Sequence, residues 1–402
     1  MRHVLVPSYM KNFQCIGSDC EDTCCAGWKV IVDKETFQKY RETKHPLMKE
    51  LLKKSVSRNR PNTSKDSYAK IQMNEDGACS LLDDEGLCKV QALLGPEMLS
   101  NTCAIYPRML NRVDETVEKS LTLSCPEATR LALLNPNGID FLEEEEPANT
   151  PGFMNRDFQT SPKHSYFWNL RIFTIQLLQD RRRSIETRLI VLGLFFQRID
   201  ALSQKEMSEH LSYIMTEYLE RLGDDEFLES ISQLPSNLSF QVNMGKSLIE
   251  YRITDGLTSK RYLDCLQDMI SGLSLEEETA MEKVIEKYTN SNEIYYFPYM
   301  KEHEYILENY LVNYVFKSLF PNDQPRLFDS YVMLIVNMAL IKLHLIGMAN
   351  THKGLTTDIV LKLVQSYSKT IDHNASYLVN VRDILKESGY STMAHMVVLL
   401  KS

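Results

Sequence analysis

After position 164, apolar residues recur at three- and four-residue spacing, which is the period of an amphipathic helix. Ser184 is placed to cap a helix over 185–199, and Ser203 with Glu206 forms a capping box ahead of the next one. The first apolar stripe consists of Tyr166, Phe167, Leu170, Phe173, Leu177 and Leu178. Later segments of this type cover 275–288, 306–319, 325–348, 356–370, 376–387 and 391–401. The pattern predicts an all-helical domain over residues 164–402.

The first 130 residues lack this period. Trp28, Val30 and Val32 alternate with other residues as in a short strand, and similar alternation covers 68–73 and 117–123. A single helix is predicted from Thr36 to about Leu52. We therefore expect residues 1–130 to form a mixed, loop-rich domain.

Residues 131–163 concentrate turn formers and like charges. They include four consecutive glutamates at 143–146 and an Asn-Thr-Pro-Gly stretch at 149–152. We expect an acidic linker rich in Pro, Gly and Asn. The predicted fold class is mainly α, with a cysteine-rich mixed domain (1–130), this linker (131–163) and a helical domain (164–402).

The longest apolar stretch, 331–349, approaches the roughly 20 residues of a membrane span. Asn337, Lys342 and His344 interrupt it, and ionisable residues are costly in lipid, so a buried core helix is the better interpretation. The apolar run at the N-terminus is too short for a signal peptide. These features predict a cytoplasmic protein without a membrane partner.

Composition narrows the choice further. Hydrophobic residues make up 43% and charged residues 25%, as in globular proteins, and 15 glycines in 402 residues favour helices. The net charge of −9 is uneven, because residues 1–130 carry 19 Lys and Arg against 18 Asp and Glu, and the remainder 26 against 36. No basic stripe with interleaved aromatics exists, which argues against nucleic acid. The acidic part suits a lysine-bearing partner or simply a solvated surface.

Eight of the nine cysteines fall between positions 15 and 125. Their spacing is C-x4-C-x3-CC, followed by C-x8-C-x14-C-x21-C. Buried free thiols and disulfides are the alternatives to metal ligation, but loops rich in Asp, Gly and Ser, in a reducing compartment, favour a metal. The predicted ligands are Cys15, Cys20, Cys24, Cys25, Cys79, Cys88, Cys103 and Cys125.

An all-sulfur donor set suits an iron–sulfur cluster or zinc. The chain lacks the paired C-x2-C knuckles of a zinc ribbon, and Gly27 stands where a C-x3-C-x2-C radical-cluster motif needs its third thiol. Neighbouring Cys24 and Cys25 are expected to point in different directions. They would then serve two ligand sets, or one site and one supporting role, and not a single ion. Tyr106 and Arg108, close after Cys103, are candidates for cofactor binding.

The motifs resemble those of the flagellin lysine-N-methylase (FliB-type) family of motile bacteria. The residues that carry the resemblance are Phe13-x-Cys15-x4-Cys20-x-Asp22-Thr-Cys24-Cys25-x-Gly27-Trp28, Cys79-x-Leu81 with Leu87-Cys88-x-Val90-Gln91, Leu99-Ser-x-Thr-Cys103-x-x-Tyr106-Pro107-Arg108, Leu123-Ser-Cys125-Pro126-Glu127-Ala128 and Leu307-Glu-Asn-Tyr-Leu-Val-Asn-Tyr-Val-Phe316 with Phe320-Pro321.

The resemblance implies methyl transfer from S-adenosylmethionine to surface lysines of flagellin by a protein with a cysteine-bound iron–sulfur centre, with zinc as the alternative metal. The cysteine part is also similar to small proteins that chelate zinc or iron. A non-catalytic, metal-binding helical protein that binds a partner or delivers metal is therefore the alternative. The sequence assigns neither a catalytic base nor an oligomeric state.

Overall fold

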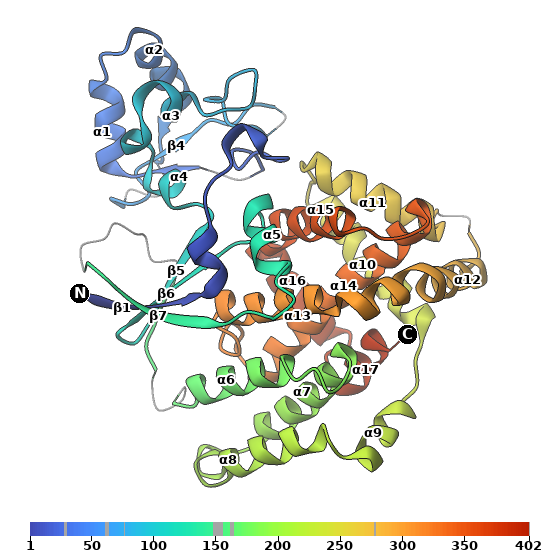
Figure 1. Ribbon diagram of the computed structural model, residues 1–402. Coiled ribbons are helices and arrows are strands. Elements are labelled where there is room, and N and C mark those ends of the chain that lie inside the picture. The colour runs from blue at the N-terminus through green and yellow to red at the C-terminus, as the bar shows by residue number, and fades with distance from the viewer. Residues whose placement is uncertain are drawn as a thin grey trace. The chain divides into compact units, whose positions relative to one another are not determined.

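The computed structural model describes residues 1–27, 30–60, 64–75, 77–147, 156–160, 165–276 and 279–401. The chain forms two compact units (Figure 1). The first, here called the thiol unit, contains Met1–Thr129, Phe141–Phe158 and Thr258–Lys260. The second, the helical unit, contains Arg130–Asp140, Gln159–Leu257 and Arg261–Ser402. The protein is mainly helical, as the hydrophobic pattern predicted, with additional β-sheet.

A five-stranded sheet of the order β7-β1-β6-β5-β8 belongs to the thiol unit. Its strands β5 and β6 form an antiparallel hairpin, and β1 runs parallel to β6. Asp114, in the two-residue turn of the hairpin, has a φ of 52°, a conformation that aspartate tolerates better than most residues. The strands are β1 (Arg2–Pro7), β5 (Arg108–Val113), β6 (Thr116–Leu121), β7 (Phe141–Glu146) and β8 (Arg156–Phe158).

The acidic run, which its composition indicated as a linker, is the edge strand β7 and pairs antiparallel with β1. Glu146 forms ion pairs with Arg2 on β1 and Lys119 on β6. An edge position leaves the other glutamates in contact with water. Residues 149–152, also interpreted as linker, lie outside the described residues.

The second sheet has the order β2-β4-β3 and packs with helices α1 and α2. The expected single helix over 36–52 is wrong, because α1 ends at Glu42 and α2 begins at Pro46. Proline has no N–H to donate and forces the residue before it, His45, into an extended conformation, so it begins a helix and does not continue one. The elements are β2 (Ile31–Val32), α1 (Lys34–Glu42), α2 (Pro46–Ser55), β3 (Val56–Arg58) and β4 (Ala69–Ile71).

Short helices complete this unit. Asp33 joins two of them, because its Oδ1 accepts a hydrogen bond from Thr36 N at the start of α1 (2.8 Å), and its Oδ2 accepts one from Asn101 N at the start of α4 (3.2 Å). The helices are η1 (Ser8–Asn12), η2 (Gly17–Asp19), α3 (Lys89–Leu94), η3 (Pro96–Met98) and α4 (Asn101–Ile105), and α5 (Pro126–Leu133) follows at the change between units.

The helical unit begins with three consecutive helices whose predicted caps are confirmed. Ser184 accepts a hydrogen bond from Thr187 N, and Ser203 with Glu206 forms the complete capping box. The helices are α6 (Phe167–Leu178), α7 (Ile185–Asp200), α8 (Gln204–Arg221), α9 (Asp225–Ser232), α10 (Leu238–Thr254), α11 (Lys260–Leu273), α12 (Met281–Ser291), α13 (Phe297–Ser318), α14 (Leu327–His352), α15 (Thr357–Tyr367), α16 (Ala375–Glu387) and α17 (Met393–Leu400), with π-helical turns η5 (Asn292–Tyr296) and η6 (Ser368–Asp372).

Helix α14 is the one described helix with the length and hydropathy of a membrane span, and 94% of its most apolar window is buried inside the protein. Its interrupting polar residues all have partners. Asn337 accepts a hydrogen bond from the Tyr367 hydroxyl (2.8 Å), and His344 contacts the Tyr262 hydroxyl (3.1 Å). Lys342 pairs with Glu186. α14 is therefore the central helix of the unit (Figure 1), as expected from its sequence.

Contacts between backbones fix α14 against α11. A Cβ atom added to Gly272 on α11 would lie 1.9 Å from the carbonyl oxygen of Gly347 on α14. Only glycine fits a backbone approach this close.

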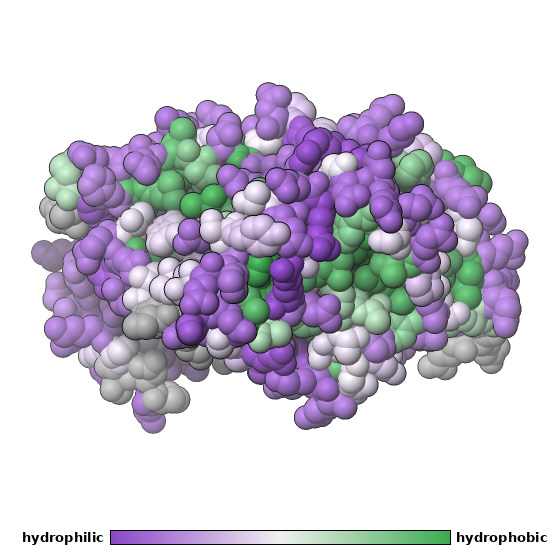
Figure 2. Space-filling view, turned by 90° about the horizontal axis from the view of Figure 1, so that it is seen from below, coloured by the Kyte–Doolittle hydropathy of each residue, from purple (hydrophilic) through white to green (hydrophobic). Residues whose placement is uncertain are grey.

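The face of the protein in Figure 2 carries mostly hydrophilic residues with hydrophobic patches between them, as is usual for a surface in water.

Candidate metal centre

Backbone hydrogen bonds bring three distant cysteine loops of the thiol unit together. Cys79 N donates to Cys25 O (2.7 Å), and the adjacent residues Ala26 and Ala78 form a β-bridge. A second bridge joins Leu82 to Cys88. Three of the predicted ligands are thus fixed near one another by main-chain contacts, although they lie up to 63 positions apart in the sequence.

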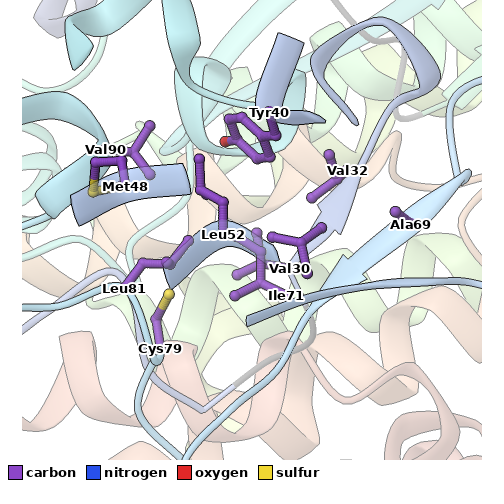
Figure 3. Packing of buried hydrophobic residues seen from close by; sticks show 11 residues of the cluster. Val30, Val32, Tyr40, Met48, Leu52, Ala69, Ile71, Cys79, Leu81 and Val90 are labelled. Atoms are coloured by element: carbon purple, nitrogen blue, oxygen red, sulfur yellow. The ribbon is translucent and has the colours of Figure 1, made fainter. Parts of the chain in front are cut away.

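The same cysteines adjoin the hydrophobic core of this unit, and Figure 3 shows Cys79 among the core residues. Cys79 is 4% exposed, belongs to the core cluster and directs its sulfur towards it, while Cys25, Cys88 and Cys103 pack against the cluster as partly buried residues. The cluster consists of Val30, Val32, Tyr40, Met48, Leu52, Val56, Ala69, Ile71, Cys79, Leu81 and Val90. We call Cys25, Cys79, Cys88 and Cys103 the core thiol set.

Burial makes the thiols of Cys79 and Cys103 hard to ionise without a counter-charge. It raises the pKa of Cys103 to about 12, and it raises the pKa of Cys79 as well. The pKa of Cys25 is raised by the contact with Cys24 and by burial. A cation that binds all four sulfurs would supply the missing positive charge, and metal thiolates are deprotonated for this reason.

Cys24 and Cys25 do not point in different directions as expected, because their sulfur atoms are 3.8 Å apart. The two residues lie in a turn, where neighbouring side chains can converge, whereas alternation holds only in extended strands. Their burial does differ: Cys24 is exposed and Cys25 is half-buried.

Three further cysteines of the thiol unit, Cys15, Cys20 and Cys125, lie outside the core thiol set. Cys20 donates from its Sγ to Asp22 O (3.0 Å), and Cys15 is exposed. Burial raises the pKa of Cys125 to about 11, hydrogen bonds from the backbone at the start of α5 lower it, and the negative charge of ionised Cys20 raises it further. Cys20 thus acts electrostatically on Cys125, while, beyond burial, Cys24 raises the pKa of both and also that of Cys79 and Cys103.

The donor chemistry fits a metal that prefers sulfur, since every candidate ligand in this unit is a cysteine. Among the residues that the structure describes, no three Cys, His, Asp or Glu side chains stand in an arrangement that could hold a metal ion. The backbone thus places the thiol-bearing loops together, while the sulfur atoms do not form a coordination shell. Trp28, the last residue of the first cysteine motif, lies outside the described residues.

Tyr106 and Arg108 contact the segments that carry Cys125 and Cys15. The Tyr106 hydroxyl contacts Ser124 Oγ (3.0 Å), directly before Cys125, and burial raises the pKa of Tyr106 well above its usual value. The guanidinium of Arg108 lies over the ring of Phe13, 5.1 Å from its centre. Both side chains therefore hold cysteine-bearing segments, and their role in cofactor binding stays a prediction.

Sequence reasoning missed a buried ionic cluster in the helical unit. Arg188 is fully buried on α7 and donates to Glu308 (2.8 Å) and to Glu304 (2.8 Å), both on α13. Arg181 donates to the same Glu308 (2.8 Å), and its pKa is raised by that carboxylate. Asn309 binds the carbonyl groups of Leu133 and Asn135. The 307–316 motif thus provides structural contacts of α13.

The candidate sulfur ligands are confined to the thiol unit, and the other unit is all-helical. Together the two units define a cysteine-rich α-helical protein. Residues 171–399 match the family model of the FliB lysine N-methylase C-terminal domain, so the chain belongs to the FliB lysine N-methylase family.

Similarity extends beyond that domain. The chain is 24% identical over 396 residues to the Lysine-N-methylase of Salmonella typhimurium, and 25% identical to that of Salmonella choleraesuis, covering 94% of each chain in both cases. It is 34% identical over 163 residues to the Flagellar biosynthetic protein FliU of Salmonella muenchen, over 40% of this chain and 95% of FliU. No solved structure matches the chain.

Proposed function

We propose that the protein is a lysine N-methylase that transfers methyl groups from S-adenosylmethionine to lysine side chains of flagellin. The observation that carries the proposal is the similarity to lysine N-methylases over 94% of both chains. The name of the FliU relative supports a flagellar substrate. The proposed compartment is the cytoplasm, where the free thiols of this chain would stay reduced.

The reaction needs a neutral lysine amine, because its lone pair attacks the methyl group of the sulfonium. An N–C bond forms, the C–S bond breaks with its electron pair passing to sulfur, and the products are S-adenosylhomocysteine, methyl-lysine and a proton. The unperturbed pKa of lysine is near 10.4, so the proton must first be removed. The acidic charge of the residues after 130 favours the approach of a lysine-bearing protein.

We further propose that the core thiol set binds the metal centre, as an iron–sulfur cluster or as zinc. The support is its four partly or fully buried sulfurs, the backbone bonds among their loops and the raised pKa values that a metal would reverse. When bound, the metal would add a link between the segments that these backbone bonds already bring together. Cys15, Cys20, Cys24 and Cys125 are proposed as further ligands. The electrostatic effects of Cys20 on Cys125, and of Cys24 on both, support the last three, and Cys15 is included for its place in the first cysteine motif.

Two assays on the full chain test the proposal. Protein purified without oxygen and reconstituted with iron and sulfide, or with zinc, is mixed with flagellin and S-adenosylmethionine, and flagellin lysines are examined by mass spectrometry. We expect mass increments of one or more methyl groups. If flagellin is unchanged with every metal form, the methylase proposal fails.

Metal content tests the core thiol set separately. Cys79→Ala and Cys103→Ala are expected to lower bound iron or zinc to a small fraction of the wild-type amount. Cys265→Ala is the matched control, because Cys265 is buried like Cys79 but lies in the helical unit beside Ser366. Equal metal content in all three variants contradicts the assignment, whatever the methylation assay shows.

A further inference from the structure

A cleft of about 370 Å³ lies in the helical unit, between the start of α6, the end of α7, the start of α8 and the loop before α14. Its volume falls in the range of small-molecule sites. Buried apolar side chains line one part, notably Phe167, Leu170 and Ile199. The other part is polar. The cleft thus has the two-sided character of a site for a ligand with an apolar body and a charged end.

The polar part is centred on an ion pair. Arg326 Nη2 donates to Asp200 Oδ2 at 2.6 Å, with side-chain exposures of 55% and 13%. Among the described residues this contact uses one nitrogen of Arg326 and one oxygen of Asp200. The remaining guanidinium N–H groups match a carboxylate, and the second Asp200 oxygen matches an ammonium group. Tyr166 and Asn322 add neutral polar groups to the lining.

We infer that this cleft binds an α-amino-carboxylate head group attached to an apolar or aromatic body. Arg326 binds the carboxylate, Asp200 binds the ammonium, and the apolar wall takes the body. The inference rests on the proposed function, under which the ligand is the methyl donor, whose amino-acid end carries both charges and whose adenosine end has an aromatic face. A free amino acid such as methionine shares the head group and is distinguished by experiment.

The loop that carries Arg326 follows directly on the 307–316 motif. Helix α13 ends at Ser318, its C-cap Leu319 is left-handed (φ 63°), and the chain turns through Phe320-Pro321 into the cleft wall. The contacts of α13 with α7 described above therefore also fix where this loop starts. This gives the motif a positioning role for one wall of the cleft.

Binding of S-adenosylhomocysteine, a stable product analogue of the donor, is measured by titration calorimetry on the full, metal-loaded chain. Adenosine, which lacks the head group, and methionine, which lacks the body, are each expected to bind at least tenfold more weakly. Arg326→Gln is expected to weaken S-adenosylhomocysteine at least tenfold, because a charge-assisted bidentate contact is lost.

The matched control is Arg182→Gln. Arg182 pairs with Asp180 at 2.5 Å, with exposures of 57% and 16% that resemble those of the cleft pair, but it does not line the cleft. The Arg182→Gln variant should bind S-adenosylhomocysteine as tightly as the wild type does. Hydrogen exchange on the wild-type protein, which needs no variant, should show slower exchange at 199–204 and 322–327 when S-adenosylhomocysteine is present.

The inference is wrong if Arg326→Gln binds as tightly as the control, if methionine alone binds as tightly as S-adenosylhomocysteine, or if the wild type does not bind S-adenosylhomocysteine. The methylation assay separates this result from the proposed function. If flagellin is methylated and Arg326→Gln binds S-adenosylhomocysteine as tightly as the wild type, the cleft inference is rejected and the methylase proposal stands. If flagellin is not methylated and Arg326→Gln binds S-adenosylhomocysteine tenfold more weakly, the cleft stands as a binding site and the methylase proposal is rejected.

Discussion

Replacing Glu308 with glutamine tests whether the buried ionic cluster holds α13 against α7. The side chain of Glu308 is 1% exposed and accepts hydrogen bonds from Arg181 and from Arg188, which is itself fully buried. Glutamine keeps nearly the same shape and one acceptor oxygen. The substitution therefore removes the charge while it leaves the packing almost unchanged.

The loss of unfolding free energy in Glu308→Gln depends on the arginine charge that is left in the interior. Removing one member of a buried ion pair costs about 3–5 kcal/mol, because the other charge is left in the interior. Glu304 still accepts a hydrogen bond from Arg188 at 2.8 Å, but its side chain is 32% exposed and compensates only in part. We therefore expect a loss at the lower end, about 3 kcal/mol of unfolding free energy.

Glu217 provides the control, because it also binds two arginines, Arg198 and Arg221. Its side chain is 21% exposed and both arginines are more exposed still, so Glu217→Gln should cost about 1 kcal/mol or less. Urea unfolding followed by circular dichroism compares the midpoints and slopes of the two variants with the wild type. Equal losses in both variants, or no loss in Glu308→Gln, would refute the assignment of α13 contacts to this cluster.

Three further predictions concern single contacts. Gly272→Ala should lower the unfolding free energy by about 2 kcal/mol or more, because its Cβ would meet the Gly347 carbonyl, whereas Gly223→Ala, whose nearest neighbour lies at 3.4 Å, should change it little. Burial lowers the pKa of His344 to about 4, so below about pH 6.5 the unfolded chain takes up a proton that the folded chain does not. The unfolding free energy should therefore fall between pH 7 and pH 5 by about 2 kcal/mol more in the wild type than in His344→Gln. Asp33→Ala should destabilise the thiol unit by about 1–2 kcal/mol in near-ultraviolet circular dichroism, since two helices lose their contact, while Asp224→Ala, which caps α9 alone, should cost less. An Asp224 effect as large as that of Asp33, or pH profiles that coincide, would contradict these assignments.

Local signals in the sequence predicted the helical unit well, because its helices are long and their caps are encoded within four residues. Ser203 and Glu206 stand three positions apart and form the expected reciprocal bonds. The break at Pro46 was equally local, and the apolar period across 36–52 hid it. The strand β7 could not be predicted in this way, since its Glu146 pairs with Arg2 and Lys119, which lie on strands more than twenty residues away in the sequence.

The thiol-bearing loops show the same division between local and distant causes. The residue type of each candidate ligand was visible in the sequence. Strand ends and loops were expected to carry them, but Cys103 lies within the short helix α4. Which cysteines come together was not visible, because the grouping depends on the Cys79–Cys25 backbone bond and on a core shared with α1 and α2. The Glu308 cluster left no signal, since glutamate and arginine are normally surface residues and only the fold buries them.

The core thiol set and the cleft assign different tasks to different residues, and this bears on what the metal does. If Arg326 and Asp200 hold both charges of the donor's head group, no open metal position is needed to bind it, and the metal then serves to join the cysteine loops. If a metal held the head group instead, Arg326→Gln would leave S-adenosylhomocysteine affinity unchanged, while removal of iron or zinc would abolish it. Titrating metal-free Cys79→Ala beside Arg326→Gln therefore distinguishes a structural metal from one that binds the donor, because each role predicts that a different variant loses affinity.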